Sequence, residues 1–289
     1  MFTPAQYCTL PGTPFPAPGD TYPDKDQVAE YLADYGVRHD LPIRLLSGMT
    51  VRVRSVDVTV LHPTSSAQLG FTTLHPAVTD FPGTVLEGLR ADDDAVLDQA
   101  LGSSASPRLR ALYSGVVLGS LVHDISLLRH LFGGIVEVDA VDVWPEQDDL
   151  VGDPPSLSVT GRLPLPRSPR TRLAWHFLPE YPSYREIVTI HHDLGTFELA
   201  FGTPYLLNAP TELRVVDAEG SAERRSVHRS VTEAFEQELL AFHAMVTQGT
   251  PPRSGIAEGR DDIRTSQRIM QSSLAEQLHE QLDGEAAHL

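Results

Sequence analysis

The sequence predicts an α+β protein built on one open, mostly antiparallel sheet with helices packed on one face. Strand-like segments follow one another over residues 136–217 with short links, which is typical of antiparallel pairing. Longer segments with helical spacing lie before and after them. Neither a strand–helix alternation nor a G-x-G-x-x-G turn occurs, so we expect no complete Rossmann domain.

The N-terminal part predicts an extended segment, a helix and a strand. Pro11–Gly19 is rich in proline, which lacks an amide donor and fixes φ, so it favours an extended surface segment. Pro23–Gly36 has apolar residues at helical spacing, with Asp24 or Asp26 as the cap. Val51–Val56 alternates apolar and charged residues, as in a half-buried strand.

A change in charge balance indicates a domain boundary near residue 56. Residues 1–56 carry 5 basic and 6 acidic residues, whereas residues 57–289 carry 17 and 33. We therefore expect an N-terminal segment, 1–56, and a main α+β domain, 57–289.

The first half of the main domain predicts a strand and one long helix. Val56–Leu61 is expected to be the strand, followed by loop and short helix over His62–Gln99, with Asp92–Asp94 at a helix N-terminus, where the dipole favours negative charge. Pro107–Leu131 is expected to be the long helix, ended by Gly133. Its apolar face comprises Leu112, Val116, Leu121, Ile125, Leu128 and Phe132.

The second half predicts the sheet and two further helices. Expected strands are Val136–Trp144, Ser156–Leu163, Arg172–Phe177, Arg185–His191, Gly195–Phe201 and Leu213–Asp217. Asp193–Gly195 is expected to be a hairpin turn. Helices are expected over Val231–Val246 and from Ile256 to about Leu282.

The amino-acid composition limits the kinds of partner that the protein is expected to bind and the compartment in which it is expected. The net charge of −17 disfavours nucleic acid and anionic membranes, which bind Lys and Arg. A single cysteine, Cys8, excludes a disulfide scaffold and Cys-based metal sites. Leu112–Leu131 is interrupted by charged residues, so it predicts a core helix rather than a membrane span. Met1–Leu10 lacks the basic and apolar regions of a secretory signal, and we expect a cytoplasmic protein.

His123, followed by Asp124, is the candidate catalytic residue. A histidine that faces a cleft from a helix can act as a general acid or base, because its pKa lies near neutrality. Alternatively, it is hydrogen-bonded at the helix–sheet interface.

An aromatic and polar stretch provides the candidate substrate-binding residues. Trp175, His176, Tyr184 and Arg185 combine stacking surfaces with hydrogen-bonding groups, which suits carbohydrate or polyol recognition. Alternatively, Trp175 and Phe177 belong to one face of a core strand.

The remaining histidines and arginines give weaker signals. His191 and His192 are adjacent in an expected strand, point to opposite faces and make a poor metal site beside a solvated turn. His62 follows a strand end, where functional loops often lie. Arg224–Arg225 is expected on an exposed face or loop. We expect no metal site.

Residues from about 57 to 270 resemble the C-terminal domain of the Gfo/Idh/MocA family of NAD(P)-dependent sugar and polyol oxidoreductases. Leu118–Gly133 resembles its helix with a D-x-G-x-H-x-[IL]-D core, and Gly195–Leu199 resembles its strand after a G-[ST] turn. Glu233–Phe242, with Gly249–Pro252 after it, resembles its penultimate helix and stop.

This resemblance implies an antiparallel sheet whose exposed face commonly forms a subunit interface. It also implies that substrate-contacting residues lie in this domain, while a Rossmann domain holds NAD(P). The sequence departs from the family in lacking that domain and the E-K-P segment, and Lys25, its sole lysine, has no such context. In the helix, Gly119 and Leu121 occupy the family's Asp and Gly positions, which leaves His123 as the match.

Residues from about 10 to 55 are similar to an internal stretch of flavin-dependent monooxygenases. Leu10–Pro16 and Tyr22–Leu32 carry this similarity. The FAD-binding unit that precedes this stretch in those enzymes, with its glycines, is absent, so FAD binding is not implied.

The sequence therefore predicts an oxidoreductase-family substrate-binding and dimerisation domain that lacks its own nucleotide-binding domain. It is expected to bind a sugar- or polyol-like molecule and to self-associate through the sheet face. One alternative is an NAD(P)-dependent oxidoreductase whose cofactor is held at a subunit interface or on a partner chain. Another is a structural or regulatory module without a small ligand.

Overall fold

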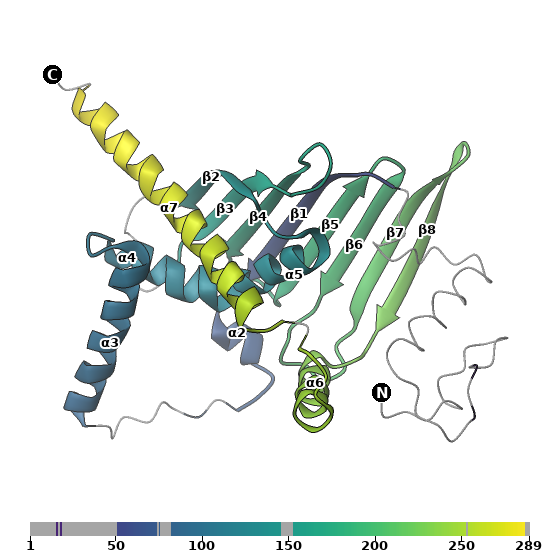
Figure 1. Cartoon of the computed structure of the whole chain (residues 1–289), viewed down its shortest axis with the longest axis horizontal. Coiled ribbons are helices and arrows are strands. Elements are labelled where there is room, and N and C mark those ends of the chain that lie inside the picture. Colours follow the sequence, from purple (N-terminus) through teal and green to yellow (C-terminus); the bar gives the residue numbers. More distant parts are fainter. Residues whose placement is uncertain are drawn as a thin grey trace. The chain divides into compact units, whose positions relative to one another are not determined.

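The computed structural model describes residues 16, 18, 51–73, 75, 82–145, 153–252 and 254–286, with backbone only for 219 and 274–286. The chain divides into two compact units, Met1–Arg52 and Val53–Leu289. All helices and strands described here belong to the second unit (Figure 1). The expected segment Pro11–Gly19, apart from Pro16 and Pro18, and the expected helix Pro23–Gly36 lie outside the described residues.

The second unit contains eight strands among the described residues. These are β1 (Val53–His62), β2 (Glu137–Trp144), β3 (Ser156–Arg162), β4 (Arg170–Phe177), β5 (Arg185–His192), β6 (Gly195–Phe201), β7 (Thr211–Glu219) and β8 (Ala222–Ser230). Its helices are α2 (Ser65–Leu69), α3 (Gly83–Leu101), α4 (Pro107–Ala111), the π-helix η3 (Leu112–Leu121), α5 (Val122–Phe132), α6 (Ala234–Gln248) and α7 (Ile256–Ala286).

The strands form one sheet in the order β2-β3-β4-β1-β5-β6-β7-β8. Every neighbouring pair is antiparallel except β1 and β4, which are parallel. The prediction of an α+β fold with an open, mostly antiparallel sheet is confirmed. The first strand in sequence thus lies in the middle of the sheet, between two strands that come more than a hundred residues later.

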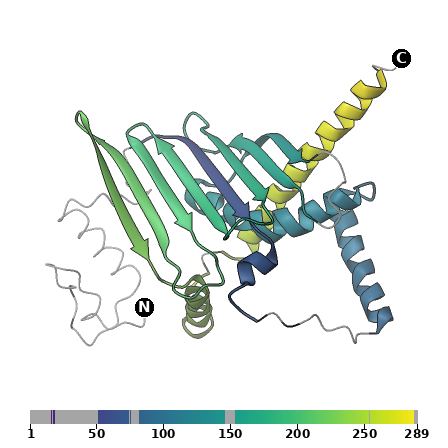
Figure 2. The ribbon, with the colours of Figure 1, turned by 180° about the vertical axis from the view of Figure 1, so that it is seen from behind.

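Alternation along the strands separates a core face from an open face. On β1, Val56, Val58 and Val60 are almost fully buried, while Asp57 and Thr59 between them are partly exposed. The helices cover only one face of the sheet: α5 and α7 cross it in Figure 1, and Figure 2 shows the opposite face without described helices. This arrangement explains why one set of alternate residues is apolar.

The long helical segment from Pro107 to Phe132 changes its winding in the middle. Its first turn is α-helical, Leu112–Leu121 is a π-helix, and Val122–Phe132 is α-helical again. The predicted apolar face is buried from Leu112 to Phe132. By composition and length this segment could span a membrane. Here, however, its apolar side chains pack on the sheet, as in the core of a soluble protein.

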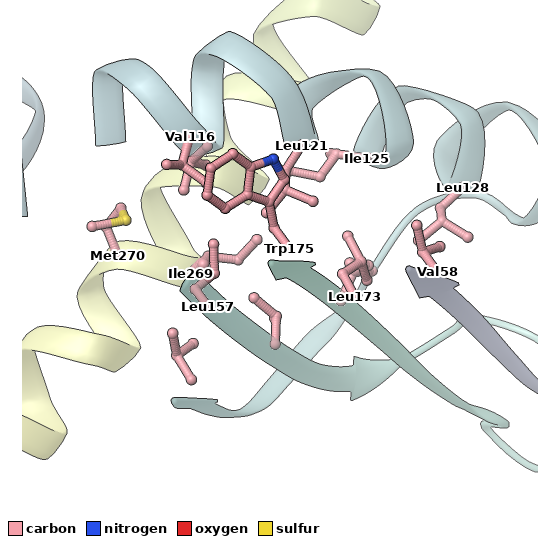
Figure 3. Packing of buried hydrophobic residues seen from close by; sticks show 14 of the residues in the cluster. Val58, Val116, Leu121, Ile125, Leu128, Leu157, Leu173, Trp175, Ile269 and Met270 are labelled. Atoms are coloured by element: carbon pink, nitrogen blue, oxygen red, sulfur yellow. The ribbon is translucent and has the colours of Figure 1, made fainter. Parts of the chain in front are cut away.

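Trp175 on β4 lies at the centre of the core. Figure 3 shows its ring beneath the helix, next to Val116, Leu121 and Ile125, while Ile269 and Met270 approach from α7. The indole Nε1 donates a hydrogen bond to Ser120 Oγ at 3.1 Å, so the one polar atom of the ring is satisfied.

One ion pair and two arginine bonds to backbone carbonyls fix α7 against the rest of the core. Arg129 on α5 donates to both oxygens of Asp262, at 2.7 and 3.0 Å. Arg268 donates to the backbone carbonyls of Ile135 and Val136 at the entry to β2. Bidentate and charge-assisted bonds of this kind hold a helix in one orientation.

Several predictions for the elements were wrong. The short helix expected within residues 62–99 is the longer helix α3, and Asp92–Asp94 lies in its middle rather than at its N-terminus. The expected strands Val51–Val56 and Val56–Leu61 are one strand, β1, which runs through residue 56. Arg224–Arg225 lies in β8, an edge strand that was not predicted.

Leu173→Ala tests the core, with Leu207→Ala as the matched control. Leu173 is fully buried, whereas Leu207 is 83% exposed. We expect L173A to lower the free energy of unfolding by about 2–5 kcal/mol and L207A to change it by less than about 0.5 kcal/mol. Urea denaturation measures both, and equal losses would contradict this account of the core.

Candidate functional site

The candidate site begins as a row of side chains across the core face of the sheet. Register places Trp175 beside Val60, Val60 beside Glu186, and Glu186 beside Phe201. Three of these four residues are apolar. Glu186 is the exception. Its carboxylate lies on the same face of β5 as the buried Val188 and Ile190.

Asp124 on α5 approaches Glu186 from the helix layer. Asp124 is only 1% exposed, and its Oδ1 has no hydrogen-bond partner among the described residues. Burial, then the negative charge of Glu186 and a hydrogen bond with it, raise the pKa of Asp124 well above its usual value. Two carboxyl groups in contact do not both ionise readily, which favours a proton shared between them.

Tyr184 extends this network toward the surface. Its hydroxyl donates to Glu186 Oε2 at 2.5 Å. Burial and the charge of Glu186 raise the pKa of Tyr184, so the phenol stays protonated. A chain of hydrogen bonds therefore runs from Asp124 through Glu186 to Tyr184.

His62 closes the aromatic side of the network at the end of β1. Its ring lies 5.0 Å from Trp175 and meets Tyr184 edge-on at 5.8 Å. Burial lowers its pKa, and Gln68 Nε2 lies 3.3 Å from its Nε2. Gln68 also donates to the carbonyl of Pro63, which positions its amide toward the histidine. His62 is thus a neutral side chain that orders the ring of Tyr184.

A cavity of about 350 Å³ opens beside Tyr184 at the rim of the sheet. This volume lies at the lower end of the range for small-molecule pockets, roughly 300–1,000 Å³. Strands β5 to β8 and the link between β6 and β7 supply its lining: Ser183, Tyr184, Arg185, Ala200, Phe201, Gly202, Pro210, Glu212, Arg214 and Arg229. Tyr184 is the residue that joins this cavity to the buried carboxyl pair.

The predicted substrate-binding residues do not lie in one place. Tyr184 and Arg185 line the cavity. Trp175 is 2% exposed and packs in the core, as the alternative interpretation held. His176, its neighbour on β4, points to the open face and contacts Trp144 edge-on at 5.6 Å. Adjacent residues of a strand face opposite sides, which is why Trp175 and His176 cannot share a site.

His123, the predicted catalytic residue, is exposed on α5. It lines neither of the cavities found among the described residues. Asp124, next to it, has the buried position instead. The helix therefore presents a carboxyl group to the sheet and the histidine to solvent.

The histidine pair at the β5–β6 turn is divided between the two faces of the sheet. His191 lies 3.2 Å from Asp57 on the open face. His192 is 6% exposed, and its Nδ1 accepts from the backbone N–H of Leu194. Asp193 and Leu194 form the predicted hairpin turn. In the described segments, no three His, Cys, Asp or Glu side chains are grouped closely enough to hold a metal ion.

A second, larger groove of about 540 Å³ lies between the end of α5 and α7. Its arginines already have partners: Arg129 binds Asp262, Arg264 lies 3.3 Å from Asp261, and Arg268 binds backbone carbonyls. None of the predicted site residues lines this groove. The cavity beside Tyr184 is therefore the better candidate.

The described residues do not fit a nicotinamide dinucleotide. Such a cofactor needs a glycine turn between a strand and a helix, so that backbone N–H groups can approach the pyrophosphate. Where a helix follows a strand directly in the described ranges, at α2 and α6, the links 63–64 and 231–233 contain no glycine. These links cannot form the required turn.

Tyr184, Arg185 and His62 were named from the sequence. Asp124 was given only as the neighbour of His123, and Glu186 was assigned no role, although signals for Asp124 and Glu186 were present. Asp124 falls three residues after Leu121 and four before Leu128, within the buried stripe. Glu186 shares its parity with Val188 and Ile190. Glu212, Arg214 and Arg229 meet Arg185 only through the register of β5 to β8, which local sequence does not show.

Comparison with known proteins found no matching family model. A stretch of 45 residues is 42% identical to the uncharacterized oxidoreductase CzcO-like of Geobacillus kaustophilus, covering 16% of this chain and 13% of that protein. A stretch of 41 residues is 53% identical to indole-3-pyruvate monooxygenase YUCCA6 of Arabidopsis thaliana, covering 14% and 10%. These short partial matches name oxidoreductases but cover little of either protein.

Solved structures similar to most of the chain are also named as oxidoreductases. The putative oxidoreductase yvaA from Bacillus subtilis is 13% identical, with a TM-score of 0.48, over 86% of this chain and 60% of that one. UDP-N-acetylglucosamine 3-dehydrogenase GnnA from Acidithiobacillus ferrooxidans is 13% identical, with a TM-score of 0.47, over 85% and 66%. The chain KijD10, a 3-ketoreductase from Actinomadura kijaniata, is 13% identical, with a TM-score of 0.45, over 82% and 56%. The chain spans about 60% of the length of the first structure, and these identities transfer no residue role.

Asp124→Asn tests the shared proton, with Asp92→Asn on an exposed face of α3 as the control. Because the pKa of Asp124 is raised in the folded state, the native protein holds this proton more tightly than the unfolded chain. That stabilisation is complete below the ordinary carboxyl pKa of 3.8 and is lost as pH rises toward the folded-state pKa.

The stability of D124N relative to the wild type should therefore increase with pH above that value, by at most about 1.4 kcal/mol per pH unit. Urea denaturation between pH 4 and 8 measures the difference. D92N should show no such slope, and a pH-independent difference for D124N would contradict the raised pKa.

Proposed function

We propose that this chain is an oxidoreductase-type substrate-binding domain of the Gfo/Idh/MocA kind, which binds a sugar- or polyol-like molecule in the cavity beside Tyr184. The observation that carries the proposal is the cavity itself, because it joins two of the predicted substrate-binding residues, Tyr184 and Arg185, to a buried proton-sharing pair. The motifs around His123 and Gly195 support the same family.

The lining suits a hydroxylated ligand. Ala200 and Phe201 contribute to the lining, the guanidinium groups donate hydrogen bonds, and the oxygen of Tyr184 can accept one while its proton bonds Glu186. A small cavity with a few convergent polar groups is a common form of small-molecule site.

Behind the cavity, Asp124 and Glu186 can hold or release a proton close to the bound ligand. Asp124 is shielded from water by the helix layer, and Tyr184 links the half-buried Glu186 to the cavity through a hydrogen bond. Groups with strongly shifted pKa values that border a cavity are typical of functional sites. In this proposal the chain binds the ligand and positions a hydroxyl, and the described residues hold no nucleotide.

The chain also self-associates through the open face of the sheet in this proposal. Arg185, Glu212 and Arg214 lie on that same face, so the second chain borders the cavity. That face carries partly buried apolar residues, including Leu61, Ile187 and Val216, with no described helix over them. An antiparallel sheet with one bare face is either solvated or covered by another chain. Light scattering at micromolar concentration should give twice the 31.6 kDa chain mass. A monomer would contradict the interface.

Tyr184→Phe tests the site, with Tyr113→Phe, a buried tyrosine of η3, as the matched control. A panel of neutral sugars and polyols is tested by thermal unfolding. A ligand at 100 times its Kd should add about 2.7 kcal/mol of stability, which raises the Tm of a protein this size by roughly 5–10 °C.

The wild type and Y113F should bind the same panel member with the same Kd. Y184F should bind it roughly 2- to 12-fold more weakly, because one hydrogen bond is removed. If no member of the panel shifts the wild-type Tm, a structural or regulatory module is favoured instead. Unchanged affinity in Y184F would exclude the cavity as the binding site.

A further inference from the structure

The cavity beside Tyr184 concentrates positive charge on a strongly acidic protein. The whole chain carries a net charge of −17. Among the residues that line this cavity, three are arginines, Arg185, Arg214 and Arg229, and one is acidic, Glu212. These four charged residues come from three strands, β5, β7 and β8.

Glu212 fixes two of the arginines and uses both its oxygens to do so. Arg214 Nε donates to Oε1 at 2.5 Å, and Arg229 Nε donates to Oε2 at 2.7 Å. Hydrogen bonds from Arg229 and Arg214 lower the pKa of Glu212, so it remains a carboxylate. Each oxygen of the carboxylate thus accepts one arginine N–H and holds that side chain in place. This reduces the conformational entropy that the two guanidinium groups lose when a ligand binds.

The arginines keep donors that have no described acceptor. Arg214 also donates through Nη1 to Glu198 at 2.8 Å, which leaves its Nη2. Arg229 makes its described bonds through Nε alone, so both of its Nη atoms remain. Arg185 is exposed and has no ion pair with any described residue. A guanidinium carries five N–H donors in a planar fork that matches carboxylate and phosphate oxygens.

Resting on the function proposed above, we propose that the ligand of this cavity carries an oxyanion, and that Arg185 binds it together with the free N–H groups of Arg214 and Arg229. The hydroxyl groups of the same molecule then face Tyr184. A carboxylate and a phosphate share this chemistry, so the ligand class is an acidic or phosphorylated sugar or polyol.

The negative charge of the whole protein makes this site selective for a hydroxylated anion over a bare inorganic anion. A net negative charge repels free anions at long range, so an inorganic ion gains little from a local group of arginines. A hydroxylated anion adds contacts to Tyr184 and to the rest of the lining, and these supply affinity that a bare ion lacks. A neutral sugar makes those contacts but leaves the free donors of three arginines unused.

Calorimetric titration of the full chain with glucose, glucuronate and glucose 6-phosphate tests the proposal. The three ligands share a ring and differ in charge, and the last two separate a carboxylate from a phosphate. We expect at least one of the two anions to bind about 10-fold or more tightly than glucose. Arg185→Gln keeps hydrogen bonding without the charge, and in R185Q this ratio should fall to about 2 or less.

Arg225→Gln on β8 is the matched control, because Arg225 lies on the same strand as Arg229 and outside the cavity lining. It should keep the wild-type ratio, and circular dichroism should show all three proteins folded. Equal affinity of the wild type for glucose and both anions, or a ratio unchanged in R185Q, would overturn the oxyanion proposal while leaving the proposed function intact. No binding of any of the three would count against both.

Discussion

The pairing of β1 between β4 and β5 is the interaction on which the rest of this structure depends. Strand β1 joins β2–β4 on one side of the sheet to β5–β8 on the other. It pairs in parallel with β4 and antiparallel with β5. Its register aligns Val56, Val58 and Val60 with the buried residues of both neighbours. A slip by one residue would move Val56, Val58 and Val60 to the open face. The same register places His62 beside Tyr184 and Glu186 beside Val60, so the site follows from the core.

The buried carboxyl pair is the place where this core departs from simple hydrophobic packing. A charged group in such an environment is costly, and neutralisation by a shared proton lowers that cost. Asp124 and Glu186 interrupt a face that is otherwise formed by Trp175, Val60 and Phe201. Tyr184 is hydrogen-bonded to Glu186 and also lines the cavity, so it links the carboxyl pair to the proposed ligand site. A polar pair with a purely structural role would lack such a link.

The sequence showed the sheet more clearly than the site. Alternation and turn residues predicted most strands, since side-chain parity is a local property. The edge strand β8 was missed because charged residues occupy both of its faces, as is common for edge strands. Helix α3 was predicted too short because, among its residues, it buries only Leu97 and so shows little amphipathic signal. The cavity depends on residues from four strands brought together by long-range register, which no local pattern contains.

In the function proposed above, this chain binds the substrate but not the nucleotide. Titration calorimetry of the purified full chain with NADPH, NADH and FAD tests that claim most directly. If this proposal holds, the titration shows no heat of binding above the heat of dilution at cofactor concentrations up to the millimolar range. Micromolar binding of any of the three would contradict it, and would instead support an oxidoreductase that holds its own cofactor by means other than a strand–glycine–helix turn.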